Sequence, residues 1–241
     1  MNTLPDSYED HRVSEEILAA HGYSIRDLER LSDLYDDEVL CSDHYLGQLF
    51  QKLHQLGLYQ NTIVIITADH GEAFLEHDYI QHCESLYQEL INVPLIIAGP
   101  GIPGGRQIHE LVELVDLTPT ILEAAGIPLT TKTSGRSFYQ ALSGTATITD
   151  DIGLADLPAK QMHALRVGKL KLIVSPDKAE LYDLSRDPRE TTDLASSRPA
   201  DLARLKQLLR DLLQQRRAGA EVTESPTPRQ LKALRTLGYL K

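Results

Sequence analysis

The chain has 241 residues and a formal net charge of −11, and hydrophobic and charged residues make up 41% and 24% of it. This composition is ordinary for a globular protein, and the length suits one domain of moderate size or one domain with a small appendage. The excess of acidic residues argues against a nucleic-acid binder, which needs a basic face to neutralise phosphates. It argues less strongly against an anionic membrane surface as partner.

Two cysteines, Cys41 and Cys83, form neither a disulfide framework nor a zinc-type spacing, so they leave the redox compartment open. The longest apolar runs are too short to span a bilayer, so no transmembrane segment is predicted. Residues 1–17 are polar and lack the apolar centre of a signal peptide. Localisation and oligomeric state therefore stay open.

A long helix and two strands are predicted in the first hundred residues. Leucine and aromatic residues recur at helical spacing over residues 25–56, and Gly57 follows as a stop. Residues 63–67 and 93–98 are runs of apolar, mainly β-branched residues without polar alternation. Such runs predict strands that are covered on both faces, as in a parallel sheet.

The middle of the chain predicts a loop, a helix and a linker. Residues 99–105 contain too many Gly and Pro residues for a regular element. A helix is predicted to follow, with Thr118 as its cap, Pro119 in its first position and Gly126 at its end. Residues 144–160 are small and polar and are predicted to be a linker or surface loop. Helices and strands in this order predict an α/β layered core.

The last part of the chain predicts a small antiparallel sheet and one helix. Residues 162–174 alternate in polarity and turn near Gly168, which predicts a half-exposed hairpin, and residues 180–183 predict a third strand. Leucines lie on one side of an amphipathic helix predicted over residues 201–217. The tail after it is predicted to wrap the surface.

Asp69 and His70 directly follow the first predicted strand. Ligands in parallel sheets bind at the carboxyl ends of strands, so a metal site is one interpretation of this pair. The alternative is an N-cap Asp beside an incidental surface His. A carboxylate favours hard cations such as calcium or magnesium, and an imidazole widens the choice to manganese or zinc.

Several motifs occur in one order along the chain. They are residues 34–39 with Asp43 and Leu46-Gly47, Thr67-Ala-Asp-His-Gly-Glu72, His82-Cys-Glu-Ser-Leu-Tyr-Gln-Glu89 with residues 93–96, residues 115–122 with 125–128, Gly135-Arg-Ser-Phe138, and Glu180-Leu-Tyr-Asp-Leu-Ser-Arg-Asp-Pro-Arg-Glu190 with residues 193–195. In this order they resemble the sulfatases, a branch of the alkaline-phosphatase-like superfamily. The resemblance covers most of the chain from about Leu34 onward and corresponds to the C-terminal half of the family fold.

This resemblance implies a partial alkaline-phosphatase-like core, a mixed sheet flanked by helices, over residues 1–148. A small C-terminal antiparallel sheet with a helix and tail is implied over residues 149–241. It further implies a hydrolase of sulfuric esters, acting on a carbohydrate or aryl sulfate, with Asp69 and His70 as ligands of one divalent metal ion. Calcium is the first expectation, with magnesium, manganese or zinc as alternatives, because many sulfatases have Asn where His70 stands.

The resemblance also assigns roles to further histidines. His82 stands where many sulfatases have a Lys that touches the sulfate, so it is predicted to be catalytic, by donating to the ester or protonating the leaving oxygen. The alternative is a structural or supporting His. His77 is predicted to pack or support, and Glu72 either to steer His70 or to favour a helix start. The remaining histidines, namely His11, His21, His44, His54, His109 and His163, are predicted to be surface or structural residues.

A nucleophile is not found in the chain. The family's Cys/Ser-x-Pro-x-Arg motif and its paired early aspartates do not occur; Ser225-Pro-Thr-Pro-Arg229 has Thr where the motif needs Pro. The chain is therefore interpreted as a fragment or a degenerate paralogue, which alone is expected to be inactive and to fold poorly. A phosphate or phosphonate ester hydrolase of the same superfamily and a non-catalytic sulfatase-like protein are the alternative functions.

Overall fold

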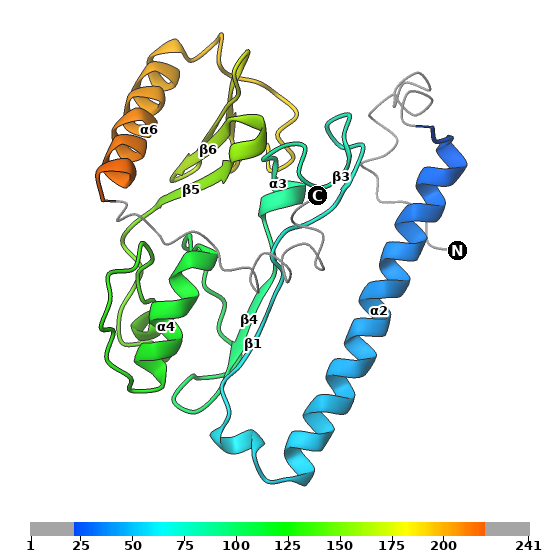
Figure 1. Ribbon diagram of the computed structural model, residues 1–241, viewed down its shortest axis with the longest axis vertical. Helices are drawn as coiled ribbons and strands as arrows, with labels where there is room; N and C mark the ends of the chain where they lie inside the picture. Colours follow the sequence, from blue (N-terminus) through cyan, green and yellow to red (C-terminus); the bar gives the residue numbers. More distant parts are fainter. Residues whose placement is uncertain (1–21, 220–241) are drawn as a thin grey trace, which may run out of the picture. The chain divides into compact units, whose positions relative to one another are not determined.

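The computed structural model describes residues 22–219, and the chain divides into two compact units at residues 197 and 198. Helices and strands both occur in the first unit (Figure 1). The mixed α/β class with a small antiparallel sheet in the C-terminal part is thereby confirmed. The predicted domain boundary near residue 148 stays a prediction.

The first described element is the helix α2, Ile25–Gln55, drawn in blue in Figure 1. A reciprocal capping box starts it, since the Asp27 amide donates to Ser24 Oγ and the Ser24 amide donates to the Asp27 carboxylate at 2.9 Å. Gly57 at φ 67° follows the helix, as predicted, because a left-handed residue there costs Gly little. A short 3-10 turn, η1 (Tyr59–Asn61), leads into the first strand.

Strand β1 (Val64–Thr67) pairs with β4 (Leu95–Ala98) in a two-stranded sheet. The pair is antiparallel, with Val64 opposite Ala98, so the prediction of a parallel arrangement is wrong. Neither strand is buried on both faces within the described residues. A run of β-branched residues reports a preference for burial, but it carries no information on the direction in which the connection returns.

The connection between β1 and β4 holds a small hairpin and one helical turn. Strands β2 (Ala73–Phe74) and β3 (Ile80–Gln81) pair antiparallel, and α3 (Gln88–Ile91) follows. Leu75 and Ile80 form a small apolar cluster with Leu28 of α2. This connection carries His77 and His82.

The predicted helix near Asp116 is present, but its start differs. A 3-10 turn, η2 (Leu114–Asp116), runs into α4 (Leu117–Ala124), and Gly126 at φ 67° follows. Thr118 lies inside the helix, so its predicted capping role is wrong. Glu113 and Asp116 form the capping box instead, because the 3-10 turn moves the first orphan amides upstream. Helix α5 (Tyr139–Ser143) follows.

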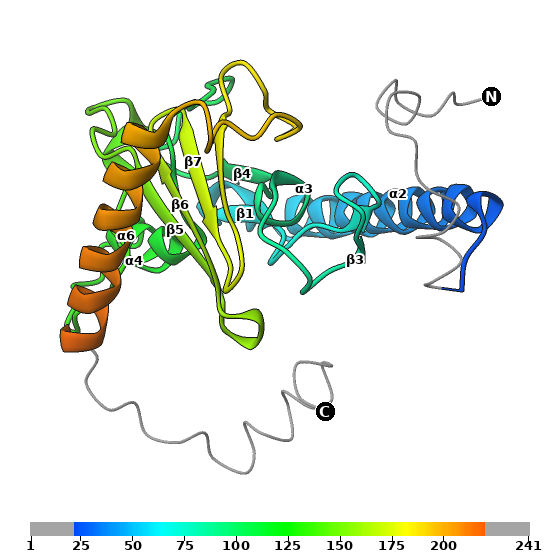
Figure 2. The same ribbon diagram turned by 90° about the horizontal axis from the view of Figure 1, so that it is seen from above.

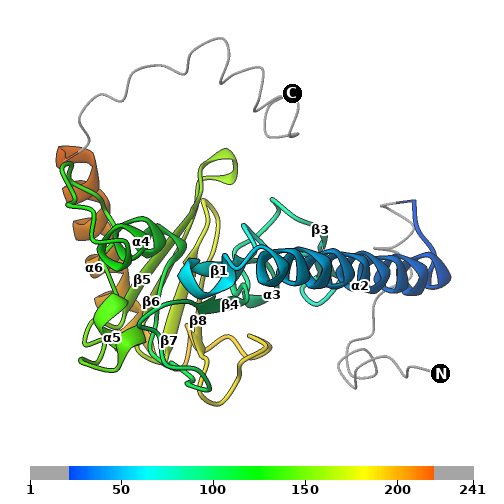
Figure 3. The same cartoon turned by 90° about the horizontal axis from the view of Figure 1, so that it is seen from below.

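A four-stranded antiparallel meander occupies the next part of the chain (Figures 2 and 3). Its strands are β5 (Ile152–Leu157), β6 (Met162–Val167), β7 (Leu170–Val174) and β8 (Ala179–Asp183). The hairpin at Gly168 and the strand near residue 180 are confirmed. The prediction of a linker over residues 144–160 is wrong in part, because β5 and the 3-10 turn η3 (Pro158–Lys160) lie there.

The β7 strand is more buried than its polarity pattern predicts. Leu170, Lys171, Leu172 and Ile173 are all buried, so the prediction of a half-exposed hairpin is wrong for this strand. One face of the sheet packs against Leu86 and Tyr87 from the connection between β1 and β4. Alternation failed as a guide because Lys171, which it places toward solvent, is held inside by an ion pair.

The second unit contains the helix α6, Pro199–Gly219. Leu205 and Leu209 are buried and the intervening Gln207 is exposed, which confirms the predicted amphipathic helix. Near its start the Arg198 guanidinium pairs with Asp201 at 2.6 Å. The predicted tail lies outside the described residues. No helix among residues 22–219 has the length and apolarity needed to cross a membrane.

Candidate functional site

The turn after β1 brings Asp69 and His70 next to α3. Gly71 forms this turn, and a Cβ on it would lie 1.9 Å from the Glu89 carbonyl oxygen. Its amide donates to the Leu90 carbonyl at 2.9 Å. Only glycine permits so close an approach of two backbones, and the approach anchors the end of β1 to the segment that carries His82.

The ring of His70 has a defined hydrogen-bonding state. Its Nδ1 lies 2.9 Å from the Gly71 carbonyl oxygen, which can only accept, so Nδ1 carries the proton. In the neutral ring Nε2 then holds the lone pair, and it lies 3.9 Å from Asp69 Oδ2. The His70 and Asp69 side chains are 36% and 65% exposed. A carboxylate and an imidazole lone pair therefore lie side by side at the surface.

The structure places His82 beside His70. The two rings stack with their centroids 4.3 Å apart and their planes at 28°. His82 Nδ1 donates to Glu72 Oε2 at 3.1 Å, and the other Glu72 oxygen is buried without a hydrogen-bond partner among the described residues. Both predictions for Glu72 are wrong, since it pairs with His82, not His70, and residues 71 and 72 lie in no helix.

The predicted metal ligands fit part of a cation site. Atoms 3.9 Å apart can both contact one cation at the usual ligand distances of about 2.0–2.4 Å. Within residues 22–219, however, there is no group of three or more His, Cys, Asp or Glu side chains that could hold a metal ion. Asp69 and His70 could therefore supply two ligands at most, and His82 has its Nδ1 engaged by Glu72.

His77 has the packing role that was predicted for it. Its Nδ1 lies 2.7 Å from Glu89 Oε1 and its Nε2 lies 3.1 Å from the Glu190 carbonyl oxygen. Its ring stacks on Tyr87 with centroids 3.7 Å apart. Burial lowers the pKa of His77, but the hydrogen bond and charge of Glu89, with the Glu190 carbonyl, raise that pKa overall. Two acceptors on the two ring nitrogens are satisfied together only by the imidazolium.

The other described histidines lie apart from this site. His109 is exposed, His44 contacts Gln48, His54 stacks on Tyr59, and His163 pairs with Asp156. These positions agree with the predicted surface or structural roles. His11 and His21 lie outside the described residues.

A buried ion pair between Lys171 and Glu190 was not predicted from the sequence. Lys171 Nζ lies 2.7 Å from Glu190 Oε1, and the two side chains are 1% and 0% exposed. Glu190 Oε2 accepts from the Gln88 amide at 2.6 Å, and Lys171 also donates to the Gln88 side chain at 3.1 Å. Glu190 is the last residue of the motif that ends in Asp-Pro-Arg-Glu, and its place in this motif was the one signal in the sequence that could have drawn attention to it.

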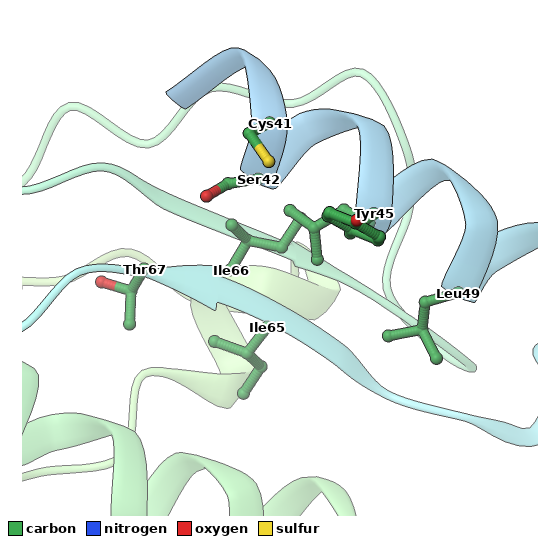
Figure 4. A pocket seen from close by; sticks show the side chains of 8 residues that line it. Cys41, Ser42, Tyr45, Leu49, Ile65, Ile66 and Thr67 are labelled. Atoms are coloured by element: carbon green, nitrogen blue, oxygen red, sulfur yellow. The ribbon is translucent and has the colours of Figure 1, made fainter. Parts of the chain in front are cut away.

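An open groove of about 590 Å³ lies between α2 and β1 (Figure 4). Unlike the surroundings of Asp69, His70 and His82, it is lined mainly by apolar residues. Its lining residues are Cys41, Ser42, Tyr45, Leu46, Leu49, Ile65, Ile66 and Thr67. In Figure 4 Ile66 points toward the helix and Ile65 toward the other face of the strand. No His, Asp or Glu lines the groove, so it offers no acid–base pair.

Comparisons with known proteins point to one family. The family model described as Sulfatase matches residues 3–127, and the model described as N-sulphoglucosamine sulphohydrolase, C-terminal, matches residues 76–218. Arylsulfatase K of Rattus norvegicus is 36% identical to the chain over 201 residues, which are 76% of this chain and 36% of the rat protein. The chain thus spans a little over a third of the length of this relative.

Several solved structures are similar to this chain, among them the following two. One is BT4656 in complex with its substrate D-glucosamine-2-N,6-O-disulfate, with a TM-score of 0.64 and 26% identity over 78% of this chain and 41% of that protein. The other is the phosphonate monoester hydrolase of Agrobacterium radiobacter, with a TM-score of 0.62 and 25% identity over 77% of this chain and 43% of that protein.

Proposed function

Because this chain belongs to the sulfatase family, we propose that it forms part of a metal-dependent hydrolase of sulfuric esters. The observation that carries the proposal is the gathering of Asp69, His70 and His82. The stacked rings of the two histidines and the nearby carboxylate come from two segments on either side of a hairpin. Three side chains that can bind a metal ion or transfer a proton, brought close together from two segments, support a catalytic function best.

In this proposal Asp69 and His70 hold a divalent cation. The Gly71 carbonyl keeps the His70 proton on Nδ1. The Nε2 lone pair can therefore bind the cation without a change of tautomer. Calcium is proposed first because of the carboxylate, with magnesium, manganese or zinc as alternatives. When bound, the cation would polarise the ester oxygens and offset charge on the leaving group.

His82 acts on the substrate side of the site. Glu72 accepts from Nδ1 of this ring, which orients it and leaves Nε2 for the ester. A protonated Nε2 donates to a sulfate oxygen or to the leaving oxygen, and a neutral one accepts. Carbohydrate and aryl sulfates are the proposed substrates, supported by the names of rat arylsulfatase K and of the disulfated glucosamine bound to BT4656.

Hydrolysis of phosphonate or phosphate esters is the second candidate. Its support is the structural similarity to the phosphonate monoester hydrolase of Agrobacterium radiobacter. In that case His82 is expected to ligate a metal ion itself, because two-metal sites need more ligands than Asp69 and His70 provide. Metal content therefore distinguishes the two candidates.

The test measures calcium bound by the 241-residue chain and by Asp69→Ala, His82→Ala and the exposed control His109→Ala. We expect weak binding in the parent chain, none in Asp69→Ala, and nearly unchanged binding in His82→Ala and the control. The chain alone should not turn over nitrophenyl sulfate, since its sequence lacks the Cys/Ser-x-Pro-x-Arg motif. Equal metal loss in His82→Ala and Asp69→Ala would instead favour the phosphoryl-transfer candidate.

A further inference from the structure

The segment that carries His77 and His82 has an unusual backbone. Leu75, Asp78, Gln81 and Cys83 have φ values of 79°, 62°, 71° and 65°. Residues other than Gly rarely adopt positive φ values, and they keep such a conformation only where surrounding contacts enforce it. The β2–β3 hairpin is too short to do so, because each of its strands has two residues.

Leu75 packs with Leu28 of α2, and further contacts that hold this segment come from α3. The Glu89 carboxylate lies 2.7 Å from the His77 ring, the Leu90 carbonyl accepts from the Gly71 amide, and the Glu89 carbonyl lies close to Gly71. The short helix therefore contacts both Gly71, which directly follows Asp69 and His70, and His77 in the strained segment that leads to His82. The position of His70 relative to His82 therefore depends on the position of α3.

A buried ion pair holds α3. The Gln88 amide at the start of this helix donates to Glu190 Oε2 at 2.6 Å, while Lys171 of β7 binds the other Glu190 oxygen at 2.7 Å. The Glu190 carbonyl also accepts from His77, and Glu190 is itself at φ 57°. Burial raises the pKa of Glu190 and lowers that of Lys171, while each charge favours the ionised form of the other.

We propose that Lys171, Glu190, Glu89 and His77 form a positioning cluster that fixes the segment of residues 71–91 and thereby the contact between His70 and His82. The functional meaning of this contact rests on the sulfatase function proposed above. None of the four residues touches the reacting groups in this arrangement. They act through α3 and the strained backbone. Lys171 and Glu190, which lie far from residues 71–91 in the sequence, connect this segment to the C-terminal sheet.

The cluster is tested by NMR on the full 241-residue chain, so the readout needs neither metal nor turnover. The signals are the contact between the His70 and His82 rings and the amide exchange of Gly71 and Gln88. Amides of Leu165 and Leu172 in the sheet serve as the reference for global opening. A failure of the proposed function would leave these signals unchanged, which keeps the two proposals separable.

Four variants divide the cluster into its parts. Glu190→Ala removes both carboxylate contacts, and Glu190→Gln keeps an oxygen for the Gln88 amide. The double variant Lys171→Met with Glu190→Gln leaves no unpaired buried charge. His77→Phe keeps a ring to stack on Tyr87 and loses both hydrogen bonds. Glu84→Gln is the matched control, because Glu84 lies in the same segment but pairs with Lys160 at the surface.

In Glu190→Ala and His77→Phe we expect amide exchange at Gly71 and Gln88 to rise about tenfold or more relative to the sheet amides, with loss of the ring contact. Glu190→Gln and the double variant should restore part of the protection at Gln88, and Glu84→Gln should behave as the parent. If Glu190→Ala does not fold, His77→Phe and the double variant decide. An unchanged ring contact in His77→Phe, or a uniform rise in exchange over segment and sheet, overturns the proposal.

Discussion

The β5–β8 sheet and the region formed by α2 with β1 and β4 differ in burial, although both are rich in aliphatic residues. In the sheet Leu165, Leu172 and Leu181 are fully buried. On α2, by contrast, Leu40 is 67% exposed and Tyr45 is 63% exposed, and the groove beside β1 is lined mainly by apolar residues.

The difference follows from connectivity. Within the meander consecutive strands pair with one another, so short turns suffice to bring their apolar side chains together on one sheet. Strand β1 has a single partner among the described residues, and α2 makes few contacts with it. A two-stranded sheet is marginal in water, and its apolar neighbours stay in solvent. The same kind of sequence therefore gives a core in one region and an apolar surface in the other.

The largest expected effect compares one leucine from each region. Leu172→Ala should lower the free energy of unfolding by about 2–5 kcal/mol, because a fully buried side chain leaves a cavity. Leu40→Ala should change it by no more than about 0.5 kcal/mol, since that side chain is already in water. Urea unfolding followed by circular dichroism measures both. Similar losses in the two variants would show that α2 is covered in solution.

A pair of glycines gives the next contrast. Gly71→Ala should destabilise the chain by about 1–3 kcal/mol, because its Cβ would overlap the Glu89 carbonyl. Gly47→Ala in α2 should stabilise it by about 0.5–1 kcal/mol, because a Cβ there meets no atom within 4 Å and Ala favours the helix. Thermal melts of both variants check the opposite signs. A neutral Gly71→Ala would contradict the close approach of β1 and α3.

The pH dependence of stability tests the buried surroundings of His77. The pKa of His77 in the folded chain is raised above its ordinary value of 6.5, so its contribution is fully present below that pH and is lost as pH rises through the folded pKa. The groups that set this behaviour are Glu89, Glu190, Glu76, Asp187 and Tyr87. A hydrogen bond to a charged group is worth about 1.5 kcal/mol or somewhat more.

His77→Phe should therefore flatten the stability profile relative to the parent, by about that amount, over the pH range that begins at the ordinary histidine pKa of 6.5 and runs up to the raised pKa of His77 in the folded chain. Urea unfolding at a series of pH values measures it, and His109→Phe at an exposed position is the control. A parent profile that rises through this range would contradict a protonated His77.

The smallest effect on stability is expected on the exposed helix. Leu40→Glu with Leu49→Glu should leave the unfolding free energy within about 1 kcal/mol of the parent, because both side chains lie in solvent. The same pair should reduce self-association and the binding of a hydrophobic dye, which apolar surfaces promote. Light scattering and dye fluorescence measure this. A parent chain that is monomeric and binds no dye would contradict the exposed surface.

Local signals in the sequence were enough for several of the elements. Four signals each act over a few residues, so helix and hairpin positions could be predicted. They are the helical spacing over residues 25–56, the stop at Gly57, the turn at Gly168 and the leucine side of α6. The placement of Asp69 and His70 at the end of a strand was local in the same sense. The family resemblance then supplied the interpretation of these residues as a metal site.

Tertiary structure alone decided the direction of β4 against β1, the pairing of Glu72 with His82 and the burial of Lys171. Each depends on which distant segments meet; His77 and Glu190, for example, are 113 positions apart. A local pattern measures the preference of a side chain for water or for an interior, but not its partner. Lys171 shows the consequence. Its polarity predicts exposure to solvent, but the Glu190 carboxylate, which comes later in the chain, offsets part of the cost of burying its charge.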